Sequence, residues 1–303
     1  MTSVMDQLEI EHDAAIPTWF RVGGRADRLA RPQTDAELAA CLRLDPNLRV
    51  LGDGANLLVA DEGVDDLVVV LGDGFRDAVM NERTGAVLAG AGADLSKLIH
   101  STVRRGLTGL EMIIGVPATV GGAAIMNAGG THGEIADSIA RVYAIDREGV
   151  PIVLERDEID FGYRRSGLNE LVVTSVEFQL SPGDPSSARE RLHEIMRDKK
   201  RTQPMKPGTC GCSFKNPVLP HDVPGVGSAG ERVGAGRLID LAGGKGTTIG
   251  ACRVSDVHAN FIESVAGATA TDILRLLDAM RALVQQRFGV TLETEVVVWS
   301  RSR

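Results

Sequence analysis

The chain has 303 residues, of which 43% are hydrophobic and 24% are charged, with 33 basic and 41 acidic side chains. This length is enough to bury a large core and predicts two domains, with three as the alternative. The formal net charge of −8 and the aromatic content of 4% argue against a nucleic-acid-binding protein. Such proteins usually carry a basic face, and those that bind single strands add stacking aromatic side chains.

The predicted elements are helices and short strands. In chain order they are a helix at 34–42, strands at 68–71 and 86–89, a helix at 95–103, a strand at 172–180, helices at 192–201 and 271–288, and a strand at 296–299. Thr34-x-x-Glu37 is a capping box, and Gly106 ends the second helix. The turn-rich segment 181–185 and the loop 203–230 predict a domain boundary near residue 200, with α+β character on both sides.

The location of the protein is inferred from what the sequence lacks. The most apolar stretch, residues 107–130, contains Glu111 and several glycines, which disfavours a membrane-spanning helix. No positively charged start leads into an apolar run, so we predict no secretory signal. We therefore expect a cytoplasmic protein that contacts neither membranes nor nucleic acids. Its oligomeric state is left open.

The cysteine pattern predicts neither a disulfide framework nor a metal site. Four cysteines are few for a chain of this length. Cys210 and Cys212 are separated by one glycine, which is too close for an unstrained bridge. This spacing also lacks the C-x-x-C pair that is typical of a zinc site.

Glycines cluster in loops beside the predicted strands, but two common nucleotide motifs are absent. The runs that start at Gly52 and Gly90 lack the third glycine of G-x-G-x-x-G, and Gly246 follows Gly244-Lys245 where a phosphate loop needs Ser or Thr. Glycine loops can still direct backbone amides at an anion. Any single loop is also explained as a tight turn, whereas the close succession of 115–122 and 127–130 favours a pyrophosphate-binding site.

Several motifs resemble one enzyme family. Residues 21–24, 52–59 and 115–130 are similar to the FAD-binding half of UDP-N-acetylenolpyruvoylglucosamine reductase, also called UDP-N-acetylmuramate dehydrogenase. The resemblance continues in order through 162–166, 214–217, 238–240, 254–262 and 292–296. Because 47 residues separate Arg164 from Cys212, the chain resembles the compact branch that lacks an extra tyrosine-bearing loop.

The resemblance implies a fold and an activity. The fold is α+β, with a two-subdomain FAD-binding domain of the vanillyl-alcohol-oxidase-like type at 1–200, divided near residue 75. A smaller α+β substrate-binding domain follows at 201–303, and its C-terminal strand carries the catalytic glutamate. The activity is that of an FAD-dependent NADPH oxidoreductase that reduces UDP-N-acetyl-3-O-(1-carboxyvinyl)-glucosamine to UDP-N-acetylmuramate. FAD is tightly bound and NADPH is a co-substrate. The reaction belongs to peptidoglycan synthesis, and through it to cell wall biogenesis, cell shape and cell division.

The family motifs also imply binding residues. For the cofactor these are Arg21, Gly52, Asp53, Gly54, Ala55, Asn56, Leu57, Val116, Pro117, Ala118, Thr119, Gly121, Gly122, Asn127, Ala128 and Gly129. For the UDP-sugar they are Tyr163, Lys215, Asn216 and His258. Lysine suits a phosphate, asparagine a sugar or amide, and histidine either. A structural role for His258 is an equal alternative.

Three residues are the candidates for the chemistry. A hydride must reach the methylene carbon of the enolpyruvyl group, negative charge develops on the neighbouring carbon and its carboxylate, and a proton must then arrive at that carbon. The planar fork of Arg164 suits a carboxylate, although a surface ion pair would also explain an arginine. The family motif selects Glu295 rather than Glu293.

Cys212 is where the chain departs from the family pattern, because the position usually holds a proton-donating serine. Ser213 is one step away, and adjacent side chains in an extended segment point to opposite faces. A thiol can donate a proton. The replacement therefore permits catalysis but leaves two alternatives open, a specialised or non-catalytic paralogue that binds FAD and a UDP-sugar, and another FAD-dependent oxidoreductase on the same fold.

Overall fold

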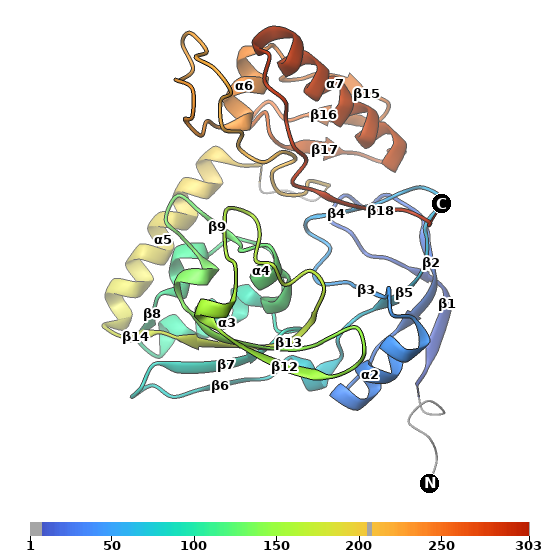
Figure 1. Cartoon of the computed structure of the whole chain (residues 1–303). Helices are drawn as coiled ribbons and strands as arrows, with labels where there is room; N and C mark the ends of the chain where they lie inside the picture. The colour runs from blue at the N-terminus through green and yellow to red at the C-terminus, as the bar shows by residue number, and fades with distance from the viewer. Residues whose placement is uncertain (1–7, 205–207, 303) are drawn as a thin grey trace. The chain divides into compact units, whose positions relative to one another are not determined.

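The structure is a computed structural model that describes residues 8–204 and 208–302. It divides into two compact units, and most of their elements are labelled in Figure 1. Unit 1 comprises residues 8–14, Ala26–Asp53 and Asp65–Lys199, and unit 2 comprises Ala15–Arg25, Gly54–Val64 and the described residues from Lys200 onward. Two early segments therefore belong to the same unit as the C-terminal third. The predicted boundaries near residues 75 and 200 remain predictions.

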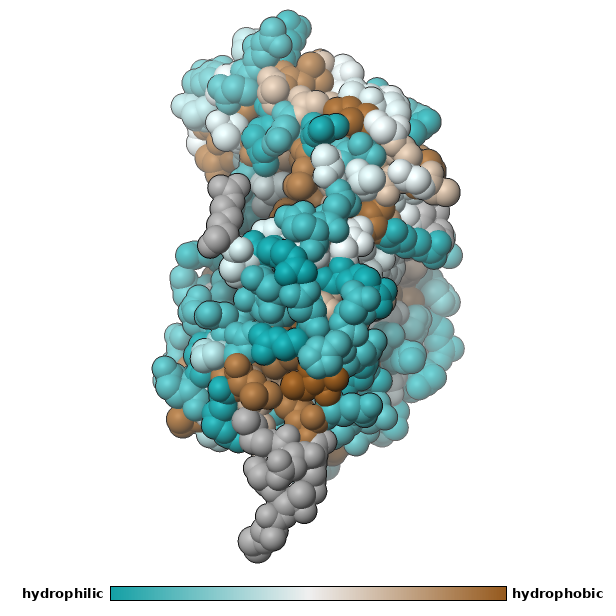
Figure 2. Space-filling model, turned by 90° about the vertical axis from the view of Figure 1, so that its right-hand side faces the viewer, coloured by the Kyte–Doolittle hydropathy of each residue, from teal (hydrophilic) through white to brown (hydrophobic). Residues whose placement is uncertain are grey.

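The surface is mixed in character. Hydrophilic residues predominate on the face in Figure 2, and apolar residues form small groups among them. Exposed apolar side chains such as Val79 and Val150 are common on protein surfaces. Within the part of the chain that the structure describes, none of the helices has the length and apolar character needed to cross a membrane.

Two β-sheets form the frame of unit 1. The strand order is β1-β2-β5-β3 in the four-stranded sheet and β12-β11-β13-β7-β6 in the five-stranded sheet. The bounds are β1 (Ile10–Ala15), β2 (Arg25–Ala30), β3 (Arg49–Val50), β5 (Val64–Val69), β6 (Ala78–Met80), β7 (Ala86–Gly90), β11 (Ile139–Ile145), β12 (Pro151–Glu155) and β13 (Val172–Gln179). The five-stranded sheet is antiparallel, whereas β3 and β5 run parallel. Two short antiparallel pairs, β8 (Leu107–Thr108) with β14 (Ser181–Pro182) and β9 (Gly129–Gly130) with β10 (Gly133–Glu134), complete the unit.

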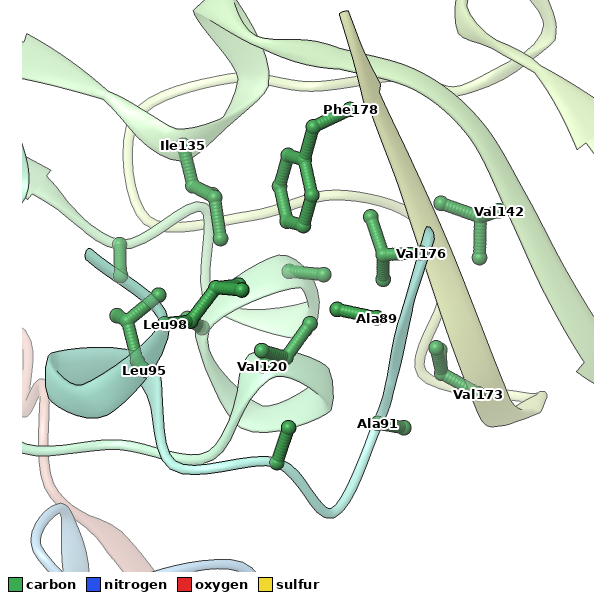
Figure 3. Close-up of a cluster of buried hydrophobic side chains, with 14 of the residues drawn as sticks. Ala89, Ala91, Leu95, Leu98, Val120, Ile135, Val142, Val173, Val176 and Phe178 are labelled. Atoms are coloured by element: carbon green, nitrogen blue, oxygen red, sulfur yellow. The ribbon is translucent and has the colours of Figure 1, made fainter. Parts of the chain in front are cut away.

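The core of unit 1 lies against one face of the five-stranded sheet. Val176 and Phe178 of β13 are buried and point toward Leu98 and Val120 (Figure 3). These last two residues lie on α3 (Leu95–Arg104) and α4 (Val120–Ile125). Alternation along β13 places its partly exposed residues on the other face, as expected for a sheet that is covered on one side.

The predicted helices of unit 1 form, and the structure adds one. Thr34 accepts a hydrogen bond from the Glu37 N–H at the start of α2 (Asp35–Leu44), and Asp94 caps α3 in the same way. The third predicted helix begins earlier, as α5 (Pro185–Thr202). The added helix is α4, which forms inside the glycine-rich run because Thr119 caps its first turn and the helix packs on β13.

Unit 2 contains a three-stranded sheet with two helices and a separate pair of parallel strands. The bounds are β15 (Thr248–Ile249), β16 (Cys252–Val254), β17 (Ile262–Ser264), α6 (Ala235–Leu241), α7 (Ala270–Phe288), β4 (Leu57–Val59) and β18 (Val297–Trp299). Helix α7 packs on β15, β16 and α6, with a capping box at Thr269 and a left-handed Gly289 at its end. Strand β4 pairs with the C-terminal strand β18, which explains why the early segment around β4 belongs to this unit.

Candidate active site

The predicted cofactor residues are divided between the two units. Unit 1 holds Gly52, Asp53, Val116, Pro117, Ala118, Thr119, Gly121, Gly122, Asn127, Ala128 and Gly129, and unit 2 holds Arg21, Gly54, Ala55, Asn56 and Leu57. The larger group lies on two glycine loops, 115–122 and 127–130, and at the end of the segment that follows β3. The residues 115–119 are partly exposed.

The loop at 115–122 is fixed by backbone contacts on one side. The N–H groups of Val120 and Gly121 donate to the carbonyl oxygens of Ala93 and Ala91 at 2.9 and 2.8 Å. A Cβ at Gly121 would lie 2.8 Å from the Ala91 Cβ. Gly121 is therefore needed for close packing inside unit 1.

Gly122 differs from Gly121 because packing does not require a glycine there. Its φ lies outside the left-handed region, and the nearest atom to an added Cβ is Thr119 Oγ1, at 3.3 Å. An added Cβ at Gly52 would meet the same hydroxyl at 2.9 Å. Thr119 thus lies beside a second predicted cofactor segment, and Gly122 leaves open a space that a side chain would fill. Such a cradle fits the close approach of a pyrophosphate to the backbone.

Asn127 holds the second loop in place. Its side chain is fully buried, and Nδ2 donates to Glu134 Oε2 at 2.7 Å and to the Gly162 carbonyl oxygen at 3.0 Å. Oδ1 accepts from the Ala136 N–H at 3.3 Å. The Asn127 amide is therefore used within the protein. It links the loop to Gly162, the first residue of the turn 162–165 that carries Arg164.

The turn Gly162–Arg165 places Arg164 beside that loop. The backbone groups of Gly162 and Arg165 bond to each other at 3.0 and 3.1 Å, and Arg164 adopts a left-handed φ of 56°. Its Nη2 donates to the Gly129 carbonyl oxygen at 3.1 Å, and its guanidinium carbon lies 5.4 Å from the centre of the Tyr163 ring. Unit 1 thus brings Tyr163 and Arg164 to the predicted cofactor loop.

In unit 2, the segment that directly follows the candidate Cys212 pairs with the segment that contains the candidate Glu295. Phe214 and Thr294 form an antiparallel bridge. The Lys215 N–H donates to the Glu293 carbonyl oxygen at 2.9 Å, and the Glu295 N–H donates to the Ser213 carbonyl oxygen at 2.8 Å. Chain segments 80 residues apart in the sequence are therefore held in one register.

Cys212 and Ser213 differ in exposure. Cys212 is partly exposed, whereas Ser213 is 1% exposed, and its Oγ has no hydrogen-bond partner among the described residues. Cys210, two positions earlier, is buried with its Sγ 3.9 Å from the Leu57 carbonyl oxygen, and burial raises the pKa of its thiol to about 12. Of the two cysteines in this segment, Cys212 is the accessible one.

The polar residues that follow Ser213 in the sequence, Lys215 and Asn216, also bond to other residues of unit 2. Lys215 Nζ lies 2.5 Å from Glu293 Oε1, and Glu293 is the more exposed partner. Asn216 Oδ1 accepts from the Ala235 N–H at 2.9 Å, at the start of α6. Asn216 therefore ties the segment 212–216 to α6 while its side chain lies partly at the surface.

His258 is partly buried beside the same elements. Its Nδ1 accepts from the Asn260 N–H at 3.2 Å, and its ring packs edge-on against Phe261 at 5.1 Å. Burial, and then the charge of Lys245, lower the pKa of His258. A neutral ring that accepts at Nδ1 carries its proton on Nε2.

Two predicted cofactor residues of unit 2 have clear structural roles. Asn56 Nδ2 donates to the Glu295 carbonyl oxygen at 3.0 Å, and its own carbonyl oxygen accepts from the Val297 N–H at 3.0 Å. Gly54 has a φ of 66°, and an added Cβ would lie 2.3 Å from the Pro17 carbonyl oxygen. Arg21 is exposed at a turn, again with a left-handed φ, of 57°. Asn56 thus fixes the backbone of the glutamate that the sequence proposed for catalysis.

Sequence reasoning missed Asn260. It lies in the motif from which only His258 was chosen, and it is 2% exposed. A signal was present, because an asparagine between Ala259 and Phe261 in an apolar run is a buried polar residue that requires hydrogen-bond partners.

Comparison with known proteins defines the class of the chain. Residues 26–155 match the family model described as FAD binding domain. The structure of 6-hydroxy-D-nicotine oxidase from Arthrobacter nicotinovorans has a similar fold over 94% of this chain and 87% of that chain, with a TM-score of 0.57 and 14% identity. The chain is an FAD-dependent oxidoreductase with a two-domain α+β fold of the vanillyl-alcohol-oxidase-like type, as predicted.

Further matches define the family. Residues 203–299 match the model of the UDP-N-acetylenolpyruvoylglucosamine reductase C-terminal domain. The UDP-N-acetylenolpyruvoylglucosamine reductase of Moorella thermoacetica is 40% identical over 93% of this chain and 90% of its own length. The crystal structure of the enzyme from Thermus caldophilus covers 96% of this chain and 98% of that chain, with 37% identity and a TM-score of 0.79. The chain belongs to the UDP-N-acetylenolpyruvoylglucosamine reductase family, and this prediction is confirmed.

Proposed function

We propose that the chain reduces UDP-N-acetyl-3-O-(1-carboxyvinyl)-glucosamine to UDP-N-acetylmuramate with NADPH, as a step of peptidoglycan precursor synthesis, and that Arg164, Cys212 and Glu295 carry the reaction. The observation that supports these roles most directly is the pairing of 213–215 with 293–295, because it holds Glu295 opposite Ser213, the residue that follows Cys212. We place the reaction in the cytoplasm, since NADPH is an intracellular reductant.

FAD is the resident cofactor of this activity. Bound FAD would supply the redox chemistry of this reaction, the transfer of a hydride from NADPH to the methylene carbon of the enolpyruvyl group. We assign its pyrophosphate to the cradle formed by Gly52, Thr119 and Gly122, where an added side chain would fill the space. Asn127 holds the neighbouring loop in shape through its buried amide.

Arg164 is assigned to the substrate carboxylate. Negative charge develops on this carboxylate and on the carbon beside it during reduction, and a guanidinium fork stabilises such charge through two parallel hydrogen bonds. The bond from Nη2 to the Gly129 carbonyl oxygen fixes the orientation of the guanidinium group. The Tyr163 ring against the guanidinium restricts its rotation further.

Cys212 is assigned as the donor of the proton that completes the lactyl ether. The Sγ–H bond breaks, the proton bonds to the carbon that carries the negative charge, and solvent later returns a proton to the thiolate. Glu295 is assigned to the same part of the reaction, the reduction of the sugar. Its carbonyl oxygen accepts a hydrogen bond from the Asn56 side chain, and its N–H donates to the Ser213 carbonyl oxygen. Lys215, Asn216 and His258 are assigned to the phosphates and sugar.

The experiment that tests this function separates two half-reactions. Purified protein is reduced with NADPH without oxygen, and bleaching of the flavin absorbance is recorded. The enolpyruvyl sugar is then added. We expect the absorbance to return and a product that is heavier than the sugar by two hydrogens. Bleaching without recolouring by this sugar contradicts the proposal and favours a paralogue that retains FAD. Rapid recolouring by oxygen alone favours an oxidase.

A further inference from the structure

We propose that Asn260 is a positioning residue for the segment 212–216, and that its side-chain amide sets the rate at which the enolpyruvyl sugar is reduced. The inference rests on the proposed function. It adds a residue that bonds to the backbone of Ser213 and Phe214, directly after the proposed donor Cys212.

The Asn260 amide bonds to both backbone groups of one residue. Its Nδ2 donates to the Phe214 carbonyl oxygen at 2.8 Å, and its Oδ1 accepts from the Phe214 N–H at 2.9 Å. The Asn260 carbonyl oxygen also accepts from the Ser213 N–H at 2.8 Å. A single buried asparagine therefore makes three hydrogen bonds to two consecutive residues of the segment.

These bonds fall on the side of Phe214 that the paired segment does not reach. The residues on either side of Phe214 bond to 293–295, through the Lys215 N–H and the Ser213 carbonyl oxygen. In an antiparallel pair the backbone groups of the residue between them point away from the partner strand. Asn260 thus takes the place of a second neighbouring strand. Without its amide, two buried backbone groups of Phe214 lose their partners.

The turn that carries Asn260 is itself held in place. His258 Nδ1 accepts the Asn260 N–H, and the Phe261 N–H donates to the His258 carbonyl oxygen at 3.0 Å, which closes a tight turn. Gly236 of α6 packs above it, where an added Cβ would lie 2.8 Å from His258 Cε1 and 3.4 Å from the Asn260 Cβ. The turn therefore has little freedom to rotate, and the position of Phe214 follows from it.

The consequence for catalysis is geometric. The segment begins at Cys212 and continues to Lys215 and Asn216, so a shift of Phe214 displaces the proposed donor together with the substrate-binding side chains. A misplacement of about 1 Å can cost about 10²-fold in rate. The hydrogen bonds of Asn260 go to Ser213 and Phe214, beside the proposed proton donor, so we expect the shift to slow the sugar half-reaction and not the reduction of the flavin.

Two variants test the inference in the holoenzyme. Asn260→Ala removes the amide, and we expect flavin reoxidation by the sugar to slow by about 10²-fold, with reduction by NADPH unchanged. Asn260→Asp is the sharper variant. A charged carboxylate keeps the acceptor for the Phe214 N–H but repels the Phe214 carbonyl oxygen, whereas a protonated carboxyl supplies both an acceptor and a donor.

The pH profile distinguishes positioning from a general loss of stability. We expect the rate of Asn260→Asp, divided by the wild-type rate at the same pH, to rise from about pH 8 to about pH 5.5, because burial favours the protonated carboxyl. The groups around this site that also titrate or carry charge are His258, Lys245, Arg281, Cys212, Glu295 and the Lys215–Glu293 pair. Division by the wild-type rate removes the titration that these groups show in the wild type.

Ser264→Ala is the matched control. Ser264 lies on β17 of the same unit, and its hydroxyl, which has one proton to donate, lies 2.7 and 3.0 Å from the Phe20 and Gly208 carbonyl oxygens. This change removes a hydrogen bond without touching 212–216, so we expect wild-type rates in both half-reactions.

Three results overturn the inference: wild-type reoxidation in Asn260→Asp at neutral pH, a rate ratio that stays flat across pH, or equal slowing in Ser264→Ala. If Asn260→Ala does not fold, the Asn260→Asp profile decides alone. A wild-type protein whose reduced flavin the sugar does not reoxidise overturns the proposed function, and with it this inference.

Discussion

Arg164 is the residue at which charge and geometry can be separated. Arg164→Lys keeps the charge but loses the planar fork, so we expect reoxidation of the flavin by the sugar to slow by about 10²-fold or more. Reduction by NADPH should proceed at the wild-type rate. Stopped-flow absorbance measures both. Arg165→Lys is the control, because Arg165 is exposed and paired with Asp160 at 3.1 Å. Equal slowing in both variants would show that the fork of Arg164 is not the cause.

The two neighbouring glutamates give a second test at the residue scale. Glu295→Gln should slow the sugar half-reaction by about 10²- to 10⁴-fold, the range for loss of a placed acid or base. Glu293→Gln should change the rate little, because the exposed pair with Lys215 is worth at most about 1 kcal/mol. Single-turnover rates at saturating sugar provide the comparison. If the two variants behave alike, the motif has selected the wrong glutamate.

At the scale of elements, helix α4 contains one glycine that close packing requires, Gly121, and one that leaves open space beside it, Gly122. Gly122→Val should fold with a free energy of unfolding within about 0.5 kcal/mol of wild type in the flavin-free protein, yet bind little FAD. Gly121→Ala should instead lose about 1–3 kcal/mol through overpacking against Ala91. The ratio of flavin to protein absorbance and denaturant unfolding measure the two effects. Full flavin occupancy in Gly122→Val would show that the pyrophosphate does not bind at this loop.

The turn around His258 predicts a dependence of stability on pH. Burial lowers the folded-state pKa of His258, so below the unfolded value of about 6.5 the unfolded chain binds more protons than the folded chain. Stability from this group is therefore present above about pH 6.5 and is lost as the pH falls. His258→Asn keeps an acceptor near Nδ1 and should flatten this part of the profile. Denaturant unfolding from about pH 8 to about pH 5 measures it.

The exposed His193 on α5 supplies the control for this profile. His193→Asn should leave the pH dependence of unfolding as it is in the wild type. A profile that is unchanged by His258→Asn would show that another group causes the loss of stability in acid.

At the scale of the whole molecule, local signals explain which elements were predictable. Helices α3 and α7 carry apolar residues with helical period between a polar cap and a glycine, so their ends were close to the prediction. Helix α4 was missed because glycines and alanines give no such period, and its stability comes from packing on β13. Tertiary contact overrides weak local propensity there.

The candidate site was predictable only in part, for a related reason. The family resemblance supplied the candidates, but no local pattern reveals that Asn56 bonds to the backbone of Glu295, 239 positions away. The same holds for Asn260 and Phe214, which lie 46 positions apart. Pairing between distant segments depends on the folded chain, and it also assigns the early segment around β4 to unit 2.

The central claim is that this chain completes the sugar half-reaction with a thiol at position 212. The most direct measurement is stopped-flow reoxidation of NADPH-reduced enzyme by the enolpyruvyl sugar in Cys212→Ala, Cys212→Ser and Ser213→Ala. We expect Cys212→Ala to be slower than wild type by about 10²- to 10⁴-fold, Cys212→Ser to remain active, and Ser213→Ala to react at the wild-type rate. A slow Ser213→Ala beside a normal Cys212→Ala would contradict the account and make the buried Ser213 hydroxyl the donor.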